Sequence, residues 1–168
     1  MNNTFNRTYR TPKFFLCTHH AEEEFVGFED SSERHAHFLF CVYGVFKIFV
    51  LDFDSNKSEM IELNSSHHRK LHDITKYLSY PVGVKMNENT RTISFNPWRK
   101  DEKWNGRLVE TGVIKSNQNY SCLICYQGSV KINNQTLDQM TYCDLKKDKE
   151  YDIIVNDNSY LAFFEHEE

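Results

Sequence analysis

The stretch ERHAHFLFCVYGVFKIFVLDFD, residues 33–54, decides the fold expected of this chain. It holds a His-x-His pair, His35 and His37, followed by a run of β-branched and aromatic residues that Gly44 interrupts once. Such residues favour strands, and a glycine between two strand-like runs is typical of a tight turn. The stretch therefore predicts two consecutive strands joined at Gly44.

The second half of the chain repeats this stretch as YSCLICYQGSVKINN, residues 120–134. At an offset of 84 positions, half the chain length, five residues in ten are identical. The matched pairs are Leu39 and Leu123, Cys41 and Cys125, Gly44 and Gly128, Lys47 and Lys131, and Ile48 and Ile132. This repeat predicts an internal duplication, with two similar β units in tandem.

The charge and apolar runs of the chain exclude several partner classes. The formal net charge of the 168 residues is -4, divided as -2 in each half, which argues against nucleic acid as a partner. The first ten residues, MNNTFNRTYR, lack the apolar core of a signal peptide, and the longest apolar run, residues 38–51, is too short to cross a bilayer. We therefore expect a cytoplasmic protein without a membrane partner.

The five cysteines predict packed thiols rather than redox chemistry. Their number is odd and no secretion signal precedes them, so reduced side chains are expected. Cys122 and Cys125 form a CxxC pair, but they lie in a predicted strand, where residues three apart point to opposite faces. We expect both to be buried thiols.

Short strand-like segments separated by turn signals occupy the rest of the chain. We predict them at residues 13–19, 25–28, 60–63, 90–95, 107–114, 120–126, 129–132, 135–137, 151–155 and 160–165. Residues 80–83 (YPVG) are a turn signal, and residues 65–78 suit a helical turn or a loop with a strand equally well. This pattern predicts an all-β sandwich or barrel. Its parts are a lead-in at residues 1–12, units at 13–96 and 107–168, and a connector at 97–106.

These residues resemble the cupins, a family of small β jelly rolls marked by two motifs. The first motif has His-x-His, then a glutamate and a glycine; the second has Pro-x-Gly and a later histidine. This chain has His35-Ala36-His37, Gly44 and Pro81-Val82-Gly83 in that order. The resemblance implies an all-β fold of two small cupin-like jelly-roll units in tandem.

The chain departs from the cupin pattern at two positions and in its second unit. Cys41 or Val42 stands where the glutamate would fall, and Met86 stands where the last histidine would fall. The second unit keeps the glycine but has Asn119 and Ser121 at the positions of the two histidines.

Two kinds of chemistry are open for His35 and His37. On a strand both imidazoles share a face and can bind one divalent metal ion, but a tight site needs a third ligand, which only His67, His68 or His72 could supply nearby. Alternatively, Arg34-His35-Ala36-His37 resembles the sugar-nucleotide 3,4-ketoisomerases. That likeness implies metal-free proton transfer, with His35 and His37 as the catalytic residues.

Aromatic and cationic residues elsewhere suit a binding protein, since they can stack on a nucleotide-like ligand and contact its phosphates. They are Tyr43 and Tyr126 beside the repeated glycines, and Trp98, Arg99, Trp104 and Arg107 near the junction of the units. The alternative is that the tryptophans only pack and the arginines are solvated or paired with Asp101 and Glu102.

Because the catalytic motif is incomplete, we expect a protein that binds, senses or sequesters a phosphorylated, nucleotide- or sugar-type small molecule. A cupin-type isomerase is the alternative. Exposed strand edges predict a homodimer.

Changing His35 and His37 together to Gln tests their predicted role. Strand alternation places the pair on the face that Leu39 and Cys41 continue. The double variant should keep the thermal unfolding temperature of the wild type, because a site residue adds little to packing, and should lose ligand affinity or activity. A double variant that unfolds would show that the pair is structural.

Overall fold

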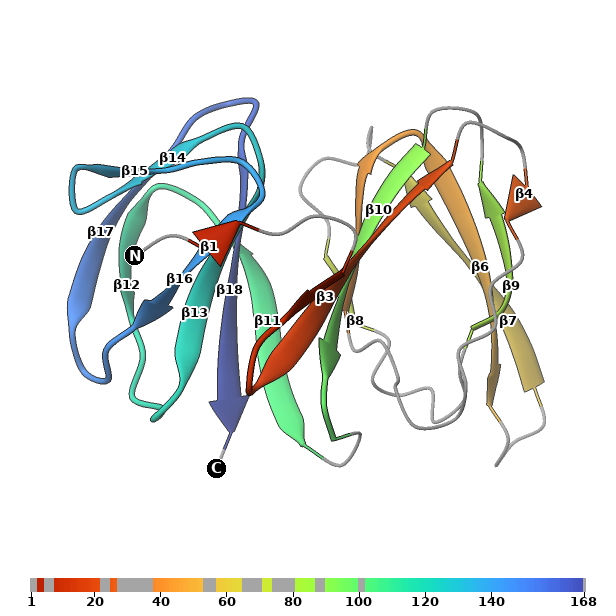
Figure 1. Ribbon diagram of the computed structural model, residues 1–168, viewed down its shortest axis with the longest axis horizontal. Helices are drawn as coiled ribbons and strands as arrows, with labels where there is room; N and C mark the ends of the chain where they lie inside the picture. The colour runs from red at the N-terminus through yellow and green to blue at the C-terminus, as the bar shows by residue number, and fades with distance from the viewer. Residues whose placement is uncertain are drawn as a thin grey trace. The chain divides into compact units, whose positions relative to one another are not determined.

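The computed structural model describes residues 3–4, 8–21, 25–26, 38–52, 57–64, 71–73, 81–86, 90–99 and 102–167. Within these ranges every regular element is a β-strand, and no helix is long and apolar enough to cross a membrane (Figure 1). The chain divides into two compact units, here named the N-terminal unit (residues 7–101) and the C-terminal unit (residues 1–6 and 102–168). The all-β prediction is confirmed.

Two antiparallel sheets form the N-terminal unit. The larger has, in order, β2 (Thr8–Arg10), β3 (Phe14–Ala21), β10 (Thr90–Pro97), β5 (Phe38–Tyr43) and β8 (His72–Asp73). The smaller has β4 (Phe25–Val26), β9 (Pro81–Met86), β6 (Val45–Asp52) and β7 (Lys57–Asn64). The central stretch of the sequence thus supplies one strand to each sheet, β5 and β6, with Gly44 between them.

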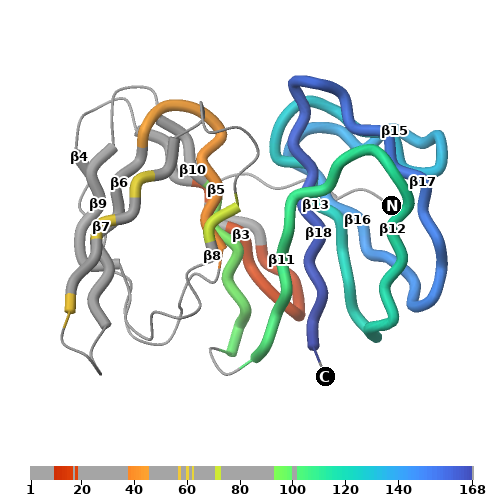
Figure 2. Tube along the Cα trace, turned by 180° about the vertical axis from the view of Figure 1, so that it is seen from behind, coloured from red at the N-terminus to blue at the C-terminus, as the bar shows by residue number. Residues whose placement is uncertain are grey.

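The C-terminal unit repeats this arrangement. Its larger sheet has, in order, β1 (Asn3–Thr4), β16 (Thr141–Leu145), β13 (Ser121–Gln127), β18 (Tyr160–Glu167) and β11 (Lys103–Val109). Its smaller sheet has β12 (Gly112–Lys115), β17 (Glu150–Val155), β14 (Val130–Ile132) and β15 (Gln135–Leu137). Figure 2 shows β13 and β18 side by side, as their antiparallel pairing requires.

The strand register is the same in the two units, as an internal duplication predicts. In the N-terminal unit Cys41 pairs with Thr92 and Tyr43 with Arg91, so that Val42 is skipped. In the C-terminal unit Cys125 pairs with Leu161 and Gln127 with Tyr160, so that Tyr126 is skipped. Each bulge therefore lies at the same repeat position, directly before a glycine with positive φ, 81° at Gly44 and 70° at Gly128. A bulge bends its strand, which here leads the chain from the larger sheet into the smaller one.

An apolar core fills the C-terminal unit between its two sheets. Alternate residues of each strand contribute to it, as expected for strands with one face turned inward. Its buried members are Val109, Ile114, Leu123, Cys125, Val130, Ile132, Leu137, Leu145, Tyr151, Ile153, Leu161 and Phe163.

Several predicted elements need correction. Residues 1–12, expected as a polar lead-in, contain β1 and β2, because short polar segments can add edge strands to an existing sheet. Strand β16 was not predicted from TYCDL; its pairing with β13 overrides the weak strand preference of Asp144. The YPVG segment, expected as a turn, enters β9 at Pro81, a position where a strand tolerates proline. Of residues 65–78, the structure describes only 71–73.

The segment expected to connect the units is shorter than predicted. β10 continues through Pro97, and β11 begins at Lys103 rather than at Arg107. Residues 103–106 look polar in the sequence, but they pair with residues 164–167 at the end of β18. The backbone hydrogen bonds of this pairing do not depend on apolar side chains.

Gly128→Ala should destabilise the protein, because a Cβ at this position would lie 2.3 Å from the Ser159 Oγ in a left-handed backbone conformation. We expect a loss of about 1–3 kcal/mol, measured by thermal or urea unfolding. Gly112→Ala is the matched comparison, because its φ of 159° is also positive but its Cβ would meet nothing within 4 Å, so it should lose less stability. Equal losses in the two variants would contradict this account.

Candidate functional site

Comparison with the C-terminal unit shows which residues of β5 point to the interior of the N-terminal unit. Cys125 belongs to the apolar core of the C-terminal unit, and its thiol donates to the carbonyls of Gln127 and Gly128 at 3.5 and 3.6 Å. The Cys41 thiol makes the same two hydrogen bonds, to Tyr43 and Gly44, at 3.3 and 3.4 Å. Cys41 and its neighbour at i−2, Leu39, therefore occupy the inward positions of β5.

Buried polar residues line this interior face. Ser94 pairs across the sheet with Leu39, so both share the inward face, and Asn96 follows two residues later. Ser94 is 4% exposed and Asn96 3%. The Asn96 amide donates to the Ser94 hydroxyl at 3.0 Å and to the Phe15 carbonyl at 3.3 Å. Such hydrogen bonds offset much of the cost of burying the two polar groups.

A histidine and an aromatic pair border this polar face. His72 pairs with Leu39 on the other side of β5 and is partly exposed. Phe15 pairs with Asn96, and its ring lies 4.8 Å from the ring of Trp98. The face thus combines hydroxyl, amide, imidazole and aromatic groups.

The same positions are largely apolar in the C-terminal unit. Leu161 and Phe163 of β18 lie at the repeat positions of Thr92 and Ser94 and are buried in the core. A buried polar group remains at the end of this face: the Ser121 Oγ has no hydrogen-bond partner within the described part of the chain. Ser121 is the residue found in the second unit at the repeat position of His37.

Next to Ser121, Ser116 donates to a carboxylate oxygen of Glu165 at 2.7 Å. Glu165 pairs directly with Ser121 across the sheet. The C-terminal unit therefore keeps a small polar cluster of Ser116, Ser121 and Glu165 at the position that corresponds to His37, next to its apolar core.

The predicted site residues of the N-terminal unit differ in their surroundings. His35 and His37 lie outside the described residues, so their roles stay predictions. Tyr43 is 36% exposed at the end of β5, and Arg99 is exposed. Trp98 donates from Nε1 to the Thr11 carbonyl and packs on Phe15, so its ring is held within its own unit.

Three predicted residues lie in the C-terminal unit. Trp104 is 5% exposed, and its Nε1 donates to Glu102 at 3.1 Å while its ring centre lies 4.8 Å from that of His166. Arg107 is exposed, and its guanidinium carbon lies 5.3 Å from the centre of the Phe163 ring. Tyr126 is 1% exposed at the bulge, and burial raises the pKa of its hydroxyl.

The described residues do not form a metal site. Among them no group of three His, Cys, Asp or Glu side chains could hold an ion. Burial raises the pKa of the Cys125 thiol to about 12 and of the Cys143 thiol to about 11, as is typical of packed, unreactive thiols. Cys122 and Cys125 are both buried, as expected of the CxxC pair.

Sequence reasoning missed Ser94, Asn96 and the partly exposed His72 as members of one polar face. The signal for the first two is the alternation in TISFN, which normally indicates a strand with one face in water. Both faces are in fact buried, since Ile93 and Phe95 are 1% and 0% exposed.

No protein-family model matches this chain, and no curated protein does. Solved structures do. A conserved protein of unknown function from Pseudomonas aeruginosa PAO1 matches with a TM-score of 0.62 at 10% identity, over 92% of this chain and 80% of its own. HutD from Pseudomonas fluorescens SBW25 matches with a TM-score of 0.55 at 9% identity, over 99% and 89%.

An oxalate decarboxylase variant from Bacillus subtilis also matches, with a TM-score of 0.55 at 6% identity, over 98% of this chain and 76% of its own. Identities this low show the fold alone. The chain has a cupin fold, built as two jelly-roll units in tandem. The finer likeness to ketoisomerases stays a prediction from the sequence.

Asn96→Ala should destabilise the N-terminal unit, because it removes a buried amide and leaves the Phe15 carbonyl without that donor. A loss of about 1–3 kcal/mol is expected, measured as the shift in thermal unfolding. Asn117→Ala, at an exposed position, is the control and should leave stability unchanged within about 0.5 kcal/mol. An unchanged Asn96→Ala protein would contradict the buried placement of this amide.

Proposed function

We propose that the protein binds a small polar molecule, of the phosphorylated nucleotide or sugar type, in the interior of its N-terminal unit, and senses or sequesters it. The observation that carries this proposal is the contrast between the two interiors. Ser94 and Asn96, both buried, stand in the N-terminal unit where Phe163 and Glu165 stand in the C-terminal unit.

A polar interior is costly for a protein that only needs to fold. Each buried hydroxyl or amide must be hydrogen-bonded, and an apolar residue in its place would add burial energy. The C-terminal unit shows that this frame accepts a buried phenylalanine, Phe163, at the position of Ser94. Ligand binding gives the polar residues a use, because a few converging polar groups in a pocket orient a small molecule.

The groups at this face fit the ligand class. Ser94 and Asn96 offer hydroxyl and amide groups suited to sugar hydroxyls, and the partly exposed His72 adds an imidazole. In this proposal Tyr43 and Arg99, both exposed, contact the aromatic and phosphate parts of the ligand. His35 and His37 complete the site as the sequence predicts, either as contacts or as acid–base groups.

Binding should be visible as a rise in unfolding temperature with one member of a panel of nucleotides and nucleotide sugars, because a ligand that binds only the folded state stabilises it. His72→Gln and Arg99→Ala should reduce that shift. Arg10→Ala, which removes an exposed arginine of the same unit, is the matched control and should not reduce it.

The fate of the ligand separates binding from catalysis. A sequestered ligand is recovered unchanged after denaturation of the complex, as the proposal expects. Recovery of an isomerised sugar, abolished by substitution of His35 or His37, would instead establish the enzyme. No shift with any phosphorylated compound would count against both.

A further inference from the structure

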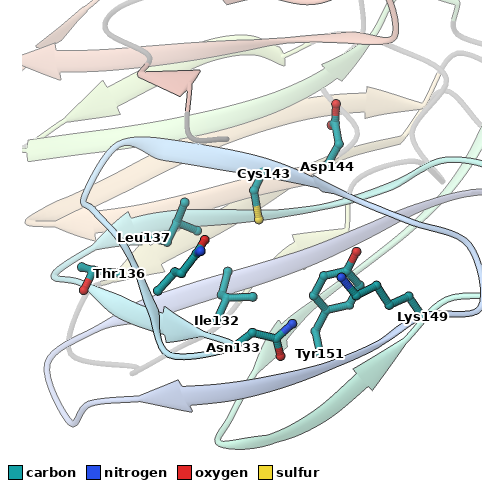
Figure 3. Close-up of a pocket in the computed structure, with 9 residues that line it drawn as sticks. Ile132, Asn133, Thr136, Leu137, Cys143, Asp144, Lys149 and Tyr151 are labelled. Atoms are coloured by element: carbon teal, nitrogen blue, oxygen red, sulfur yellow. The ribbon is translucent and has the colours of Figure 1, made fainter.

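We propose a second ligand site, in the C-terminal unit, that takes a small carboxylate with an apolar body. It is a pocket of about 410 Å³ beside the β14–β15 hairpin (Figure 3). Its lining residues are Ile132, Asn133, Gln135, Thr136, Leu137, Cys143, Asp144, Lys149 and Tyr151. This inference does not rest on the proposed function, because no residue of the N-terminal unit takes part in it.

The floor of the pocket is the edge of the apolar core. Ile132, Leu137 and Tyr151 are 8%, 1% and 8% exposed and belong to that core, and Cys143 packs against it. Burial raises the pKa of the Cys143 thiol to about 11, so it stays neutral and does not repel an anion. Only the edges of these buried side chains reach the pocket, so its floor offers a small apolar surface that suits one face of a compact apolar group.

Lys149 supplies the positive charge. Its Nζ lies 5.1 Å from the centre of the Tyr151 ring, and within the described ranges no carboxylate lies within 4.0 Å of it. The Tyr151 hydroxyl accepts a hydrogen bond from the Lys146 backbone at 2.9 Å, which fixes the ring. Its own proton remains for an acceptor in the pocket.

Asn133 adds an oriented donor. Its backbone has a positive φ of 49°, and its Oδ1 accepts from the Asp152 backbone at 2.8 Å. The side-chain NH2 is therefore the group left for a ligand. In Figure 3 the Asn133 nitrogen is turned toward Lys149 and Tyr151.

The one acidic lining residue is engaged elsewhere. The Asp144 carboxylate accepts a hydrogen bond from the Tyr120 hydroxyl at 2.8 Å, and Figure 3 shows it directed away from Lys149 and Asn133. Among the described residues, one cation without a carboxylate partner, one amide donor and one hydroxyl thus lie around the small apolar floor. That combination matches a monoanionic carboxylate with an apolar body, since charge-assisted hydrogen bonds orient the carboxylate and the floor holds the rest.

The test is an amide NMR titration of the full chain with sodium benzoate, and with benzamide as the uncharged analogue of the same shape. Benzoate should give saturable shifts at Asn133, Gln135, Thr136 and Lys149, and bind about tenfold more tightly than benzamide, the factor that one charge-assisted hydrogen bond gives. Lys149→Gln should remove that difference. Lys131→Gln, on the adjacent exposed position of β14, is the matched control and should keep it.

Three outcomes would contradict the proposal. Equal affinity for benzoate and benzamide, including no binding of either, would remove the charged site. An equal loss in the Lys131→Gln and Lys149→Gln proteins would reduce it to general electrostatic attraction. Inorganic phosphate at the same ionic strength should leave the shifts unsaturated; saturation as tight as with benzoate would show that the apolar floor plays no part. His72→Gln and Arg99→Ala should leave this titration unchanged, which separates it from the proposed function.

Discussion

Each unit depends on one corner, where a strand leaves the larger sheet and enters the smaller one. A glycine in a left-handed conformation makes the turn, and a cysteine thiol three residues earlier donates to the carbonyls around it. Because a thiolate could not donate, the bond requires a protonated sulfur, which the burial of Cys125 ensures by raising its pKa to about 12. The bulge at this corner sets the register of every residue before it, so it decides which side chains face the interior.

The two units share this backbone arrangement but differ in the side chains of their interiors. Phe163 lies in the core of one unit, and Ser94 stands at the same position in the other. Truncating a buried phenylalanine costs about 3–5 kcal/mol in typical cores, so the N-terminal unit forgoes stability of that order at this one position. At this position the interior is therefore apolar in the C-terminal unit and polar in the N-terminal unit.

The fold could be predicted from the sequence because both units have the same residue types at this corner. Cys41, Gly44 and their repeat partners revealed the duplication, and β-branched runs located most strands. The site was not readable in the same way. Ser94 and Asn96 alternate with Ile93 and Phe95, a pattern that normally indicates one wet face, and only tertiary structure shows that both faces are covered. The pocket beside Asn133 likewise needs Lys149, which folding alone brings near it.

Strand β1 makes the two halves of the chain depend on each other. Asn3 and Thr4 pair with Tyr142 and Thr141, so the earliest residues of this chain close an edge of its second half. During synthesis β1 has no partner strand until β16 has been made, and their pairing joins residues about 140 positions apart in the sequence. An excised second half would keep an open β16 edge, ready to pair with other chains. The C-terminal unit therefore obtains one of its edge strands from residues that precede the N-terminal unit in the sequence, so the two halves of the chain are not interchangeable modules.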